Sequence, residues 1–167
     1  MSAYTMIDTP MGELLVTGEP NTAAPGGLTL TSVRFADQPD ARPSGDRDDP
    51  AFAYAADQIR AYFAGARTEF APALAPRGTA FQERVWAALD AIPYGTTTTY
   101  GALAERVGAP RDRIRAVGAA VGANPLLIIR PCHRVIGASG SLTGYAGGVA
   151  RKEALLVHEG ALQPQLA

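Results

Sequence analysis

Cysteine is almost absent from this sequence, which has 167 residues, one cysteine and two histidines. The lone cysteine, Cys132, excludes an internal disulfide bond. A structural zinc site normally takes four nitrogen or sulfur ligands, and the chain offers only Cys132, His133 and His158, with no Cys-x-x-Cys pair. We therefore expect no metal, and we expect no cofactor.

Long apolar runs are absent as well. The longest candidate, PLLIIRP at residues 125–131, stops at Arg130, far short of the roughly 18 apolar residues that a membrane helix needs. The first residues, MSAYTMIDTP, have no cationic region followed by an apolar run, so they do not resemble a signal peptide. We expect a cytoplasmic protein that does not bind membranes. A hydrophobic content of 47% is sufficient for a core, in one large domain or two small ones.

Charge is distributed unevenly along the chain although the total is only −1. Residues 1–76 carry five arginines against ten acidic residues, a net charge of −5, whereas residues 77–152 carry ten basic against four acidic residues, a net charge of +6. A basic segment next to an acidic one suggests a face for a polyanion such as DNA. A set of solvated surface arginines remains an equally good interpretation at this point.

The first half has the pattern of short strands followed by a helix. Alternating apolar residues between Gly- and Pro-rich turns predict strands at residues 4–10, 12–19 and 28–36. Residues 37–50 are acidic, Pro-rich and without periodicity, so we expect an exposed loop. Asp49 followed by Pro50 predicts the start of a helix over about residues 50–64 that packs on the strands.

The second half is mainly helical in pattern. Thr79 and Gln82 form a capping box at the start of a helix. Two shorter helices, over residues 96–108 and 111–124, are separated by a tight turn and resemble a helix-turn-helix, with three arginines at the start of the second. Packing against a neighbouring helix explains the small residues of the second helix equally well. The run LLII predicts a buried strand that ends just before Cys132, and a last helix covers residues 149–160.

The surroundings of Cys132 favour a reactive thiol. A histidine follows it directly, and Arg130 and Arg134 flank it. Positive charge nearby favours the thiolate, which at an unperturbed pKa near 8.5 is only a few per cent populated at neutral pH. Taken alone, a lone cysteine is more often an inert, small apolar residue, and that alternative stays open on these residues only.

Several motifs around Cys132 resemble the O6-alkylguanine-DNA alkyltransferases. The motifs are PCHRVIG, GASGSLTGYAGG and KEALLVHEG, preceded by TAFQERVWAALDAIPYGTTTTYGALA. The resemblance is dense over about residues 76–160 and looser in the first half, where YFAGARTEF matches. It implies an α+β (α/β two-domain) fold. Residues 1–76 would form a supporting, ribonuclease H-like domain with a small sheet and a packed helix. Residues 77–167 would form the mainly helical alkyltransferase domain with a winged helix-turn-helix.

The resemblance also implies a role for each residue of the reacting site. Cys132 would accept the alkyl group, and His133 would take its proton through a water. Glu159 would hold the imidazole in the required tautomer and stabilise its charged form. Tyr100 would donate a hydrogen bond to the guanine ring, and Asn124 would tie the second helix to the active-site turn.

DNA contacts follow from the same resemblance. A base stacked in the duplex must be flipped out before it can react, and in this family an arginine of the second helix fills the gap; here RAVG matches on Arg115. The chain departs from the family by one extra residue before that arginine, so Arg113 is the alternative to Arg115 for this role. The residues expected at DNA are Arg115, Arg113, Arg111, Thr99, Ala116 and Ala119. The residues expected around the base are Tyr100, Trp86, Val135, Tyr145, Ala146 and Gly147.

The implied function is DNA repair by direct reversal. A thiolate suits attack on the saturated carbon attached to guanine O6, and the thioether formed is a poor leaving group, so the protein would act once, as a suicide methyltransferase. The implied partner is double-stranded DNA containing O6-alkylguanine, and we expect a monomer. A non-enzymatic lesion sensor or a helix-turn-helix regulator is the alternative, although neither needs Cys132, and a cysteine hydrolase would not need the arginines. Family members with zinc in the first domain use cysteines and histidines that this chain lacks.

Overall fold

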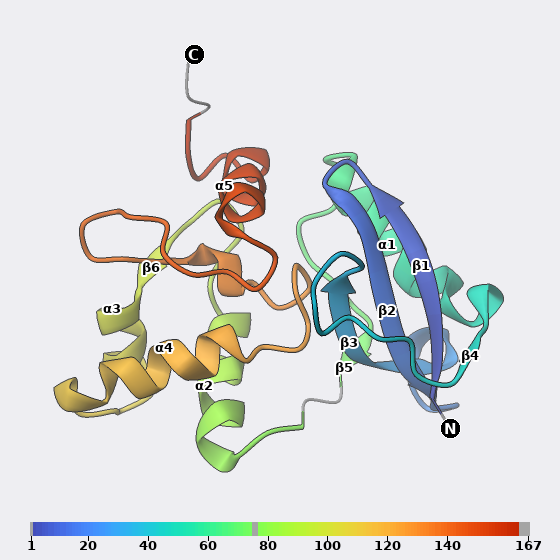
Figure 1. Ribbon diagram of the computed structural model, residues 1–167, viewed down its shortest axis with the longest axis horizontal. Helices are drawn as coiled ribbons and strands as arrows, with labels where there is room; N and C mark the ends of the chain where they lie inside the picture. The colour runs from blue at the N-terminus through green and yellow to red at the C-terminus, as the bar shows by residue number, and fades with distance from the viewer. Residues whose placement is uncertain (1, 75–76, 164–167) are drawn as a thin grey trace. The chain divides into compact units, whose positions relative to one another are not determined.

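The computed structural model describes residues 2–74 and 77–163. The chain divides into two compact units, Met1–Arg77 and Gly78–Ala167, which are described separately. The first is a small sheet with one helix, and the second is mainly helical (Figure 1). In the described residues, no helix is both long and apolar enough to cross a bilayer.

The sheet of the first unit is built on three antiparallel strands, and this confirms the strands expected from the sequence. They are β1 (Ala3–Thr9), β2 (Gly12–Pro20) and β3 (Leu28–Phe35). Two-residue strands, β4 (Asp46–Arg47) and β5 (Ala73–Leu74), pair in parallel at the two edges, giving the order β4-β1-β2-β3-β5. The acidic segment 37–50 is therefore mostly an exposed loop, but it also supplies an edge strand.

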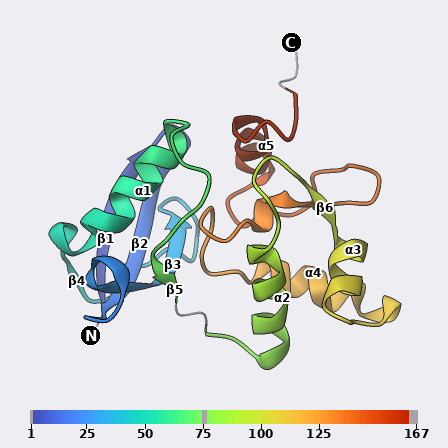
Figure 2. The same cartoon turned by 180° about the vertical axis from the view of Figure 1, so that it is seen from behind.

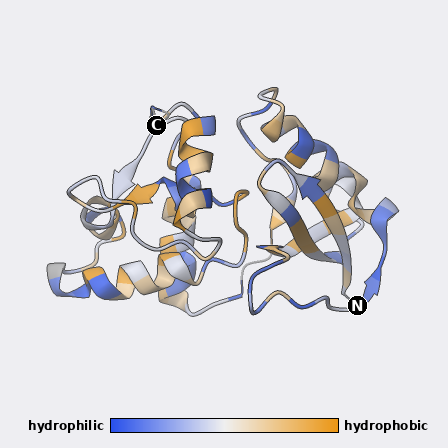
Figure 3. Cartoon of the chain, turned by 45° about the horizontal axis from the view of Figure 1, so that its top comes forward, coloured by the Kyte–Doolittle hydropathy of each residue, from blue (hydrophilic) through white to orange (hydrophobic). Residues whose placement is uncertain are grey.

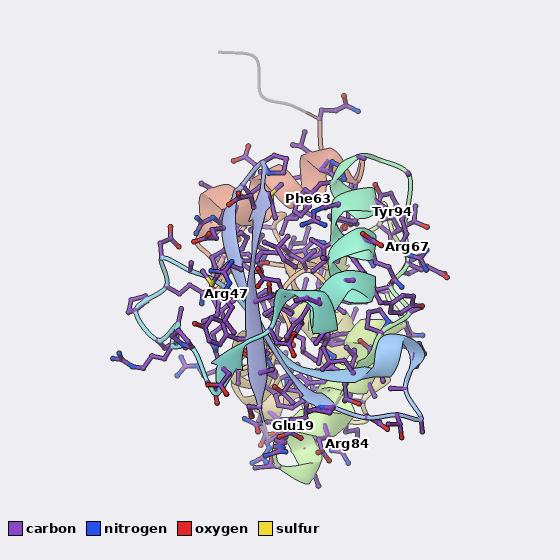
Figure 4. The ribbon with its side chains drawn as sticks, turned by 90° about the vertical axis from the view of Figure 1, so that its right-hand side faces the viewer. Glu19, Arg47, Phe63, Arg67, Arg84 and Tyr94 are labelled. Atoms are coloured by element: carbon purple, nitrogen blue, oxygen red, sulfur yellow. The ribbon has the colours of Figure 1, made fainter. Side chains whose placement is uncertain are left out.

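A short 3₁₀ helix, η2 (Asp49–Phe52), leads into α1 (Ala53–Phe63). The N-cap expected at Asp49 is one residue earlier, because the Asp48 side chain accepts the hydrogen bond from the backbone nitrogen of Ala51. The Asp49 carboxylate instead accepts hydrogen bonds from Thr5 Oγ1 at 2.7 Å and from Arg47 Nε at 2.9 Å; Arg47 is labelled in Figure 4. The helix lies over one face of the sheet, as Figure 2 shows.

The helices of the second unit are α2 (Ala80–Asp90), α3 (Tyr100–Arg106), α4 (Ile114–Gly122) and α5 (Val149–His158). The capping box is confirmed, because Thr79 accepts from the Gln82 backbone and the Gln82 side chain accepts from Thr79. Apolar and polar segments alternate along the helices (Figure 3), and α4 packs on both α2 and α3. The core contains Val85, Trp86, Leu89, Leu103, Val117, Val121, Leu155 and Leu156.

A two-stranded sheet connects distant parts of this unit. The strand β6 (Thr98–Thr99) precedes α3 and pairs in parallel with β7 (Val135–Ile136). The helix expected over residues 96–108 therefore begins only at Tyr100, because the preceding threonines are used in this pairing. The pairing brings the first residue of α3 close to the segment that contains Cys132.

The strand expected at LLII is wrong. Residues 126–129 are buried, but Leu126 forms only an isolated bridge and residues 127–129 form a turn. Ile128 has a φ of 70°, in the left-handed region that a β-branched residue rarely adopts. The side chain of Asn124 takes the place of a strand partner: its Oδ1 accepts from Leu126 N at 3.0 Å, and its Nδ2 donates to the carbonyls of Leu126 and Arg130. These bonds satisfy backbone groups that burial removes from water.

Candidate active site

Cys132 lies at the start of a 3₁₀ turn, η4 (Cys132–Arg134), rather than at the end of a strand. Its backbone nitrogen donates to the carbonyl of Arg130 at 2.8 Å across Pro131, whose φ of −81° and ψ of 54° make this an inverse γ-turn. The proline ring fixes φ, so the turn is stiff. The thiol is therefore held in one position, and only 5% of the residue is exposed.

His133 and Glu159 form a buried pair behind the thiol. His133 Nε2 lies 2.8 Å from Glu159 Oε2, and Arg134 donates to both oxygens of the same carboxylate, from Nε at 2.7 Å and from Nη2 at 3.0 Å. A third nitrogen of Arg134 donates to the carbonyl of Ile92. Glu159 is the C-cap residue of α5, so the pair joins the end of that helix to η4.

These contacts determine the tautomer of His133. A carboxylate that already accepts from arginine has only acceptor oxygens, so the imidazole must donate from Nε2. The neutral ring then carries a lone pair on Nδ1, and within the described residues this buried atom has no hydrogen-bond partner. Burial lowers the pKa of His133 below its ordinary value, against the opposing effect of Glu159. The ring is thus neutral at neutral pH and has a free basic nitrogen.

Cys132 is protonated in the resting protein. Burial raises the pKa of its thiol to about 11, and hydrogen bonding by Asn124 with the positive charges of Lys152 and Arg130 offsets only part of that effect. At neutral pH, a thiol with this pKa is ionised in about one molecule in 10⁴. A nearby base is therefore needed before Cys132 can act as a nucleophile.

The thiol opens onto a cavity of about 120 Å³. Its wall is formed by Tyr100 from α3, by one face of α4 and by the loop before α5. The Tyr100 hydroxyl donates to the carbonyl of Thr143 at 3.2 Å, whereas the buried Tyr145 hydroxyl has no partner within the described residues. The lining residues are Tyr100, Gly118, Val121, Gly122, Leu127, Cys132, Gly144, Tyr145 and Ala146.

Lys152 is a site residue that the sequence analysis missed. It is fully buried in α5, and its Nζ donates to the carbonyls of Thr143 and Gly144 and lies 5.9 Å from the centroid of the Tyr100 ring. The sequence contains an indication of this burial, because the only lysine of the chain shares a helical face with the apolar residues Leu155 and Leu156 and with Glu159. Burial lowers the pKa of Lys152, although the nearby Cys132 opposes that effect.

Three residues expected around the base lie outside the lining of this cavity. Trp86 is buried in the core, where its Nε1 donates to the carbonyl of Ala120 at 2.8 Å, so its large ring is used for packing α2 on α4. Val135 is fully buried in β7. Gly147 is buried next to the lining residues Tyr145 and Ala146, and its carbonyl accepts from Arg151.

The residues expected at DNA lie on or near α4. Arg115 and Ala119 are exposed, Ala116 is half-buried, and Thr99 caps α3 by accepting from the nitrogen of Ala102. Arg113 precedes α4 and lies over the ring of Phe81, which Arg84 (labelled in Figure 4) also approaches. Arg111 lies in the 3₁₀ turn η3 (Arg111–Arg113), and its side chain is outside the described part of the structure.

Fold and site together define a class of protein: a two-unit α+β protein whose helical unit buries one thiol beside a pocket, next in sequence to a histidine that is paired with a glutamate. The family model for the 6-O-methylguanine DNA methyltransferase DNA-binding domain matches residues 80–161, and the model for the ribonuclease-like domain of the same family matches residues 3–76. The chain belongs to the 6-O-methylguanine DNA methyltransferase family.

Relatives agree with this family over nearly the whole chain. The methylated-DNA–protein-cysteine methyltransferase of Mycobacterium tuberculosis is 50% identical over 166 residues, covering 98% of this chain and 96% of the relative. The constitutive enzyme of that name from Bacillus subtilis is 40% identical, covering 95% and 94%. The crystal structure of the M. tuberculosis O6-methylguanine methyltransferase has a TM-score of 0.86, at 50% identity and coverage of 98% and 96%. A structure of M. tuberculosis OGT in complex with DNA also has a TM-score of 0.86, at 50% identity and coverage of 95% and 93%.

The raised pKa of Cys132 predicts a loss of stability at alkaline pH. Between its ordinary value of 9.0 and its folded value of about 11, the thiol stays protonated in the folded protein but loses its proton in the unfolded chain. The free energy of unfolding should therefore fall with rising pH, by about 1.4 kcal/mol per unit in this window. Cys132→Ala should remove this part of the loss. The measurement is urea denaturation of both proteins from pH 8 to 10.5; parallel curves for the two proteins would contradict it.

Proposed function

We propose that this protein repairs DNA by direct reversal, transferring an alkyl group from guanine O6 in double-stranded DNA to Sγ of its own Cys132. The observation that carries this proposal is the buried arrangement of Cys132, His133 and Glu159 at a cavity. A lesion sensor or transcription regulator would bind DNA without needing a thiol, its base and an orienting carboxylate together. Family membership supports the same activity, methylated-DNA–protein-cysteine S-methyltransferase.

The transfer is a displacement at a saturated carbon. The bond from that carbon to Sγ forms as its bond to guanine O6 breaks, and the electron pair of the broken bond remains on the base. The thiol proton passes to Nδ1 of His133 and is returned to the departing guanine, so the base is restored unmodified. A thioether is a poor leaving group and the chain has no second cysteine to remove the alkyl group. The protein therefore reacts once.

His133 and Glu159 supply the base for this step. The free lone pair on Nδ1 is the acceptor for the thiol proton, through a water, and the imidazolium that forms is stabilised by the Glu159 carboxylate at 2.8 Å. Asn124 and Lys152 stabilise the developing thiolate, since both lower the pKa of Cys132.

The target base binds in the cavity beside Cys132. Tyr100 donates its hydroxyl to the guanine ring, in exchange for its present bond to Thr143, and this makes O6 a better leaving group. Tyr145, Ala146 and the glycine before them form the opposite wall. Asn124 holds the turn of Cys132 in register with the end of α4.

DNA binds to the helix pair α3 and α4, which we assign to a winged helix-turn-helix with α4 as the recognition helix. Arg115 is three residues before Gly118 and seven before Gly122, so it lies on the face of α4 that lines the cavity. This supports Arg115 as the residue that replaces the flipped base. Arg113 is held over Phe81, away from that face, and suits a phosphate contact, as do Thr99, Ala116 and Ala119 where the helix meets the backbone.

The two parts of the chain have different roles. Residues 77–167 carry both the reacting site and the DNA contacts, while residues 1–76 support the fold. We propose that the protein acts as a monomer in the cytoplasm, where thiols stay reduced.

Transfer should stop at one alkyl group per protein. Mixed with an excess of O6-methylguanine oligonucleotide, the intact mass should increase by one methyl group, located on the peptide that contains Cys132. Continued turnover, or methyl groups on another residue, would contradict the suicide reaction. Cys132→Ala should gain no mass but still bind the oligonucleotide, because the phosphate contacts lie elsewhere.

Glu159→Gln should slow the chemical step far more than it weakens DNA binding. The glutamine amide can donate to Nε2, which favours the tautomer with its proton on Nδ1 and removes the base. We expect a loss of about 10² to 10⁴ in the single-turnover rate. Glu153→Gln, on the same helix, is the matched control and should react like the wild type. Equal rates for the Glu159 and Glu153 variants, both folded by circular dichroism, would exclude Glu159 from the mechanism.

Arg115→Ala should slow repair of duplex DNA even at saturating DNA, but it should leave reaction with free O6-benzylguanine almost unchanged, because a free base needs no flipping. Arg113→Ala should instead weaken duplex binding at every sequence and lower the salt dependence by about one ion. Single-turnover rates on both substrates, at two salt concentrations, distinguish these patterns. If Arg113→Ala has the defect at saturation, the extra residue before α4 has shifted the role to Arg113.

A further inference from the structure

Arg130 is a buried charge that the proposed mechanism does not use. Only 4% of its side chain is exposed, and it forms a two-point ion pair with Asp90 at the end of α2, from Nε to Oδ1 at 3.1 Å and from Nη2 to Oδ2 at 3.4 Å. Its guanidinium carbon lies 5.6 Å from the ring centroid of Trp86. The side chain is therefore fixed on two sides by α2.

The backbone of the same residue holds the nucleophile. The carbonyl of Arg130 accepts from Cys132 N at 2.8 Å and from Asn124 Nδ2 at 3.3 Å. Only Pro131 separates Arg130 from Cys132, and the γ-turn geometry leaves that residue little freedom. A constraint on the Arg130 side chain is thus passed to the thiol through one rigid residue.

Stability alone does not account for this arrangement. The remaining guanidinium nitrogen of Arg130, Nη1, is buried and has no hydrogen-bond partner within the described residues. A buried, unsatisfied polar group is destabilising, and an ion pair with a buried member is often no more stable than apolar side chains of the same size. A methionine at this position would fill the same space without that cost.

The partner of Arg130 neutralises its charge only in part. The Asp90 side chain is 44% exposed, so water screens its negative charge, whereas only 4% of the Arg130 side chain is exposed. The groups around the thiol are Asn124, Lys152, Tyr100 and Tyr145 from other elements, with His133 as its neighbour within η4. Among them, Lys152 is the other cation that lowers the pKa of Cys132.

We infer that Arg130 is a positioning residue for alkyl transfer: held by Asp90 and Trp86, it fixes the turn of Cys132 and supplies a permanent positive charge that stabilises the thiolate. This inference rests on the proposed function for its biological meaning. The charge itself acts on the thiol whatever the substrate is. Asp90 then has the opposite effect, because its negative charge reduces the field of Arg130.

The test compares variants that change the charge in opposite directions. Arg130→Met removes the cation at nearly constant size, Arg130→Lys keeps it, and Asp90→Asn removes the opposing anion. The reaction of Cys132 with iodoacetamide is followed by intact mass from pH 7 to 12, so that the profile crosses the thiol pKa of about 11, and transfer from O6-benzylguanine is followed over the same range. The ion pair of Arg34 and Asp40, at 2.7 Å in the first unit, provides the matched controls Arg34→Met and Asp40→Asn.

Arg130→Met should move the rising limb of both pH profiles to higher pH by about 0.5 to 1 unit. At a pH below the limb, this shift is a threefold to tenfold loss of rate. Asp90→Asn should move the limb downward, and Arg130→Lys should restore the wild-type position. The two control variants should leave the limb in place. A purely structural role predicts slower reaction of both the methionine and the asparagine variants with an unmoved limb.

The inference is overturned if Arg130→Met and Asp90→Asn move the limb in the same direction, or if neither moves it. If Arg130→Met does not fold, the Asp90→Asn variant alone tests the inference, because Asp90 is partly exposed. A rising limb that stays at its wild-type pH, or moves to higher pH, in this variant overturns the inference. A wild-type protein that reacts with iodoacetamide but not with O6-benzylguanine would refute the proposed function, and the iodoacetamide profiles would still test Arg130.

Discussion

The Glu159 carboxylate is the acceptor on which the geometry of the site depends. It accepts from His133 and from two nitrogens of Arg134, all of them buried, and so joins the end of α5 to the turn of Cys132 and, through Arg134, to the carbonyl of Ile92. Because a carboxylate can only accept, the same contact leaves the lone pair of His133 on Nδ1. One carboxylate thus holds three segments together and sets the tautomer of His133.

Burial of Cys132 creates a conflict that the surrounding residues partly relieve. A thiol in a cavity wall is protected from oxidants and water, but burial raises its pKa to about 11. Asn124, Lys152 and Arg130 each favour the thiolate, but they offset only part of the effect of burial. The thiol is therefore protonated, and a weak nucleophile, until a nearby group accepts its proton.

Much of the fold follows from local patterns. The three long strands, α1 and the capping box at Thr79 were predicted from alternation, periodicity and hydrogen-bonding side chains, because those signals act within a few residues. The LLII prediction failed because an apolar run indicates burial, but it does not distinguish a strand from turns whose backbone is hydrogen-bonded by a neighbouring side chain, here Asn124 two residues before Leu126. Trp86 was expected in the pocket for the flipped DNA base, but an aromatic residue on an apolar helical stripe is equally suited to the core.

The sequence alone determined the candidate nucleophile, its neighbouring histidine and the basic segment, through motifs that resemble one family, because those residues are close together along the chain. Only the tertiary structure decided how burial and the surrounding charges tune that thiol. Glu159, which the family resemblance had already paired with His133, is 26 residues from it, and Asp90 is 40 residues from Arg130. Burial of Lys152 depends on how α5 packs. Charge interactions weaken with distance and strengthen with loss of water, and both quantities are set by packing between segments that no local pattern connects.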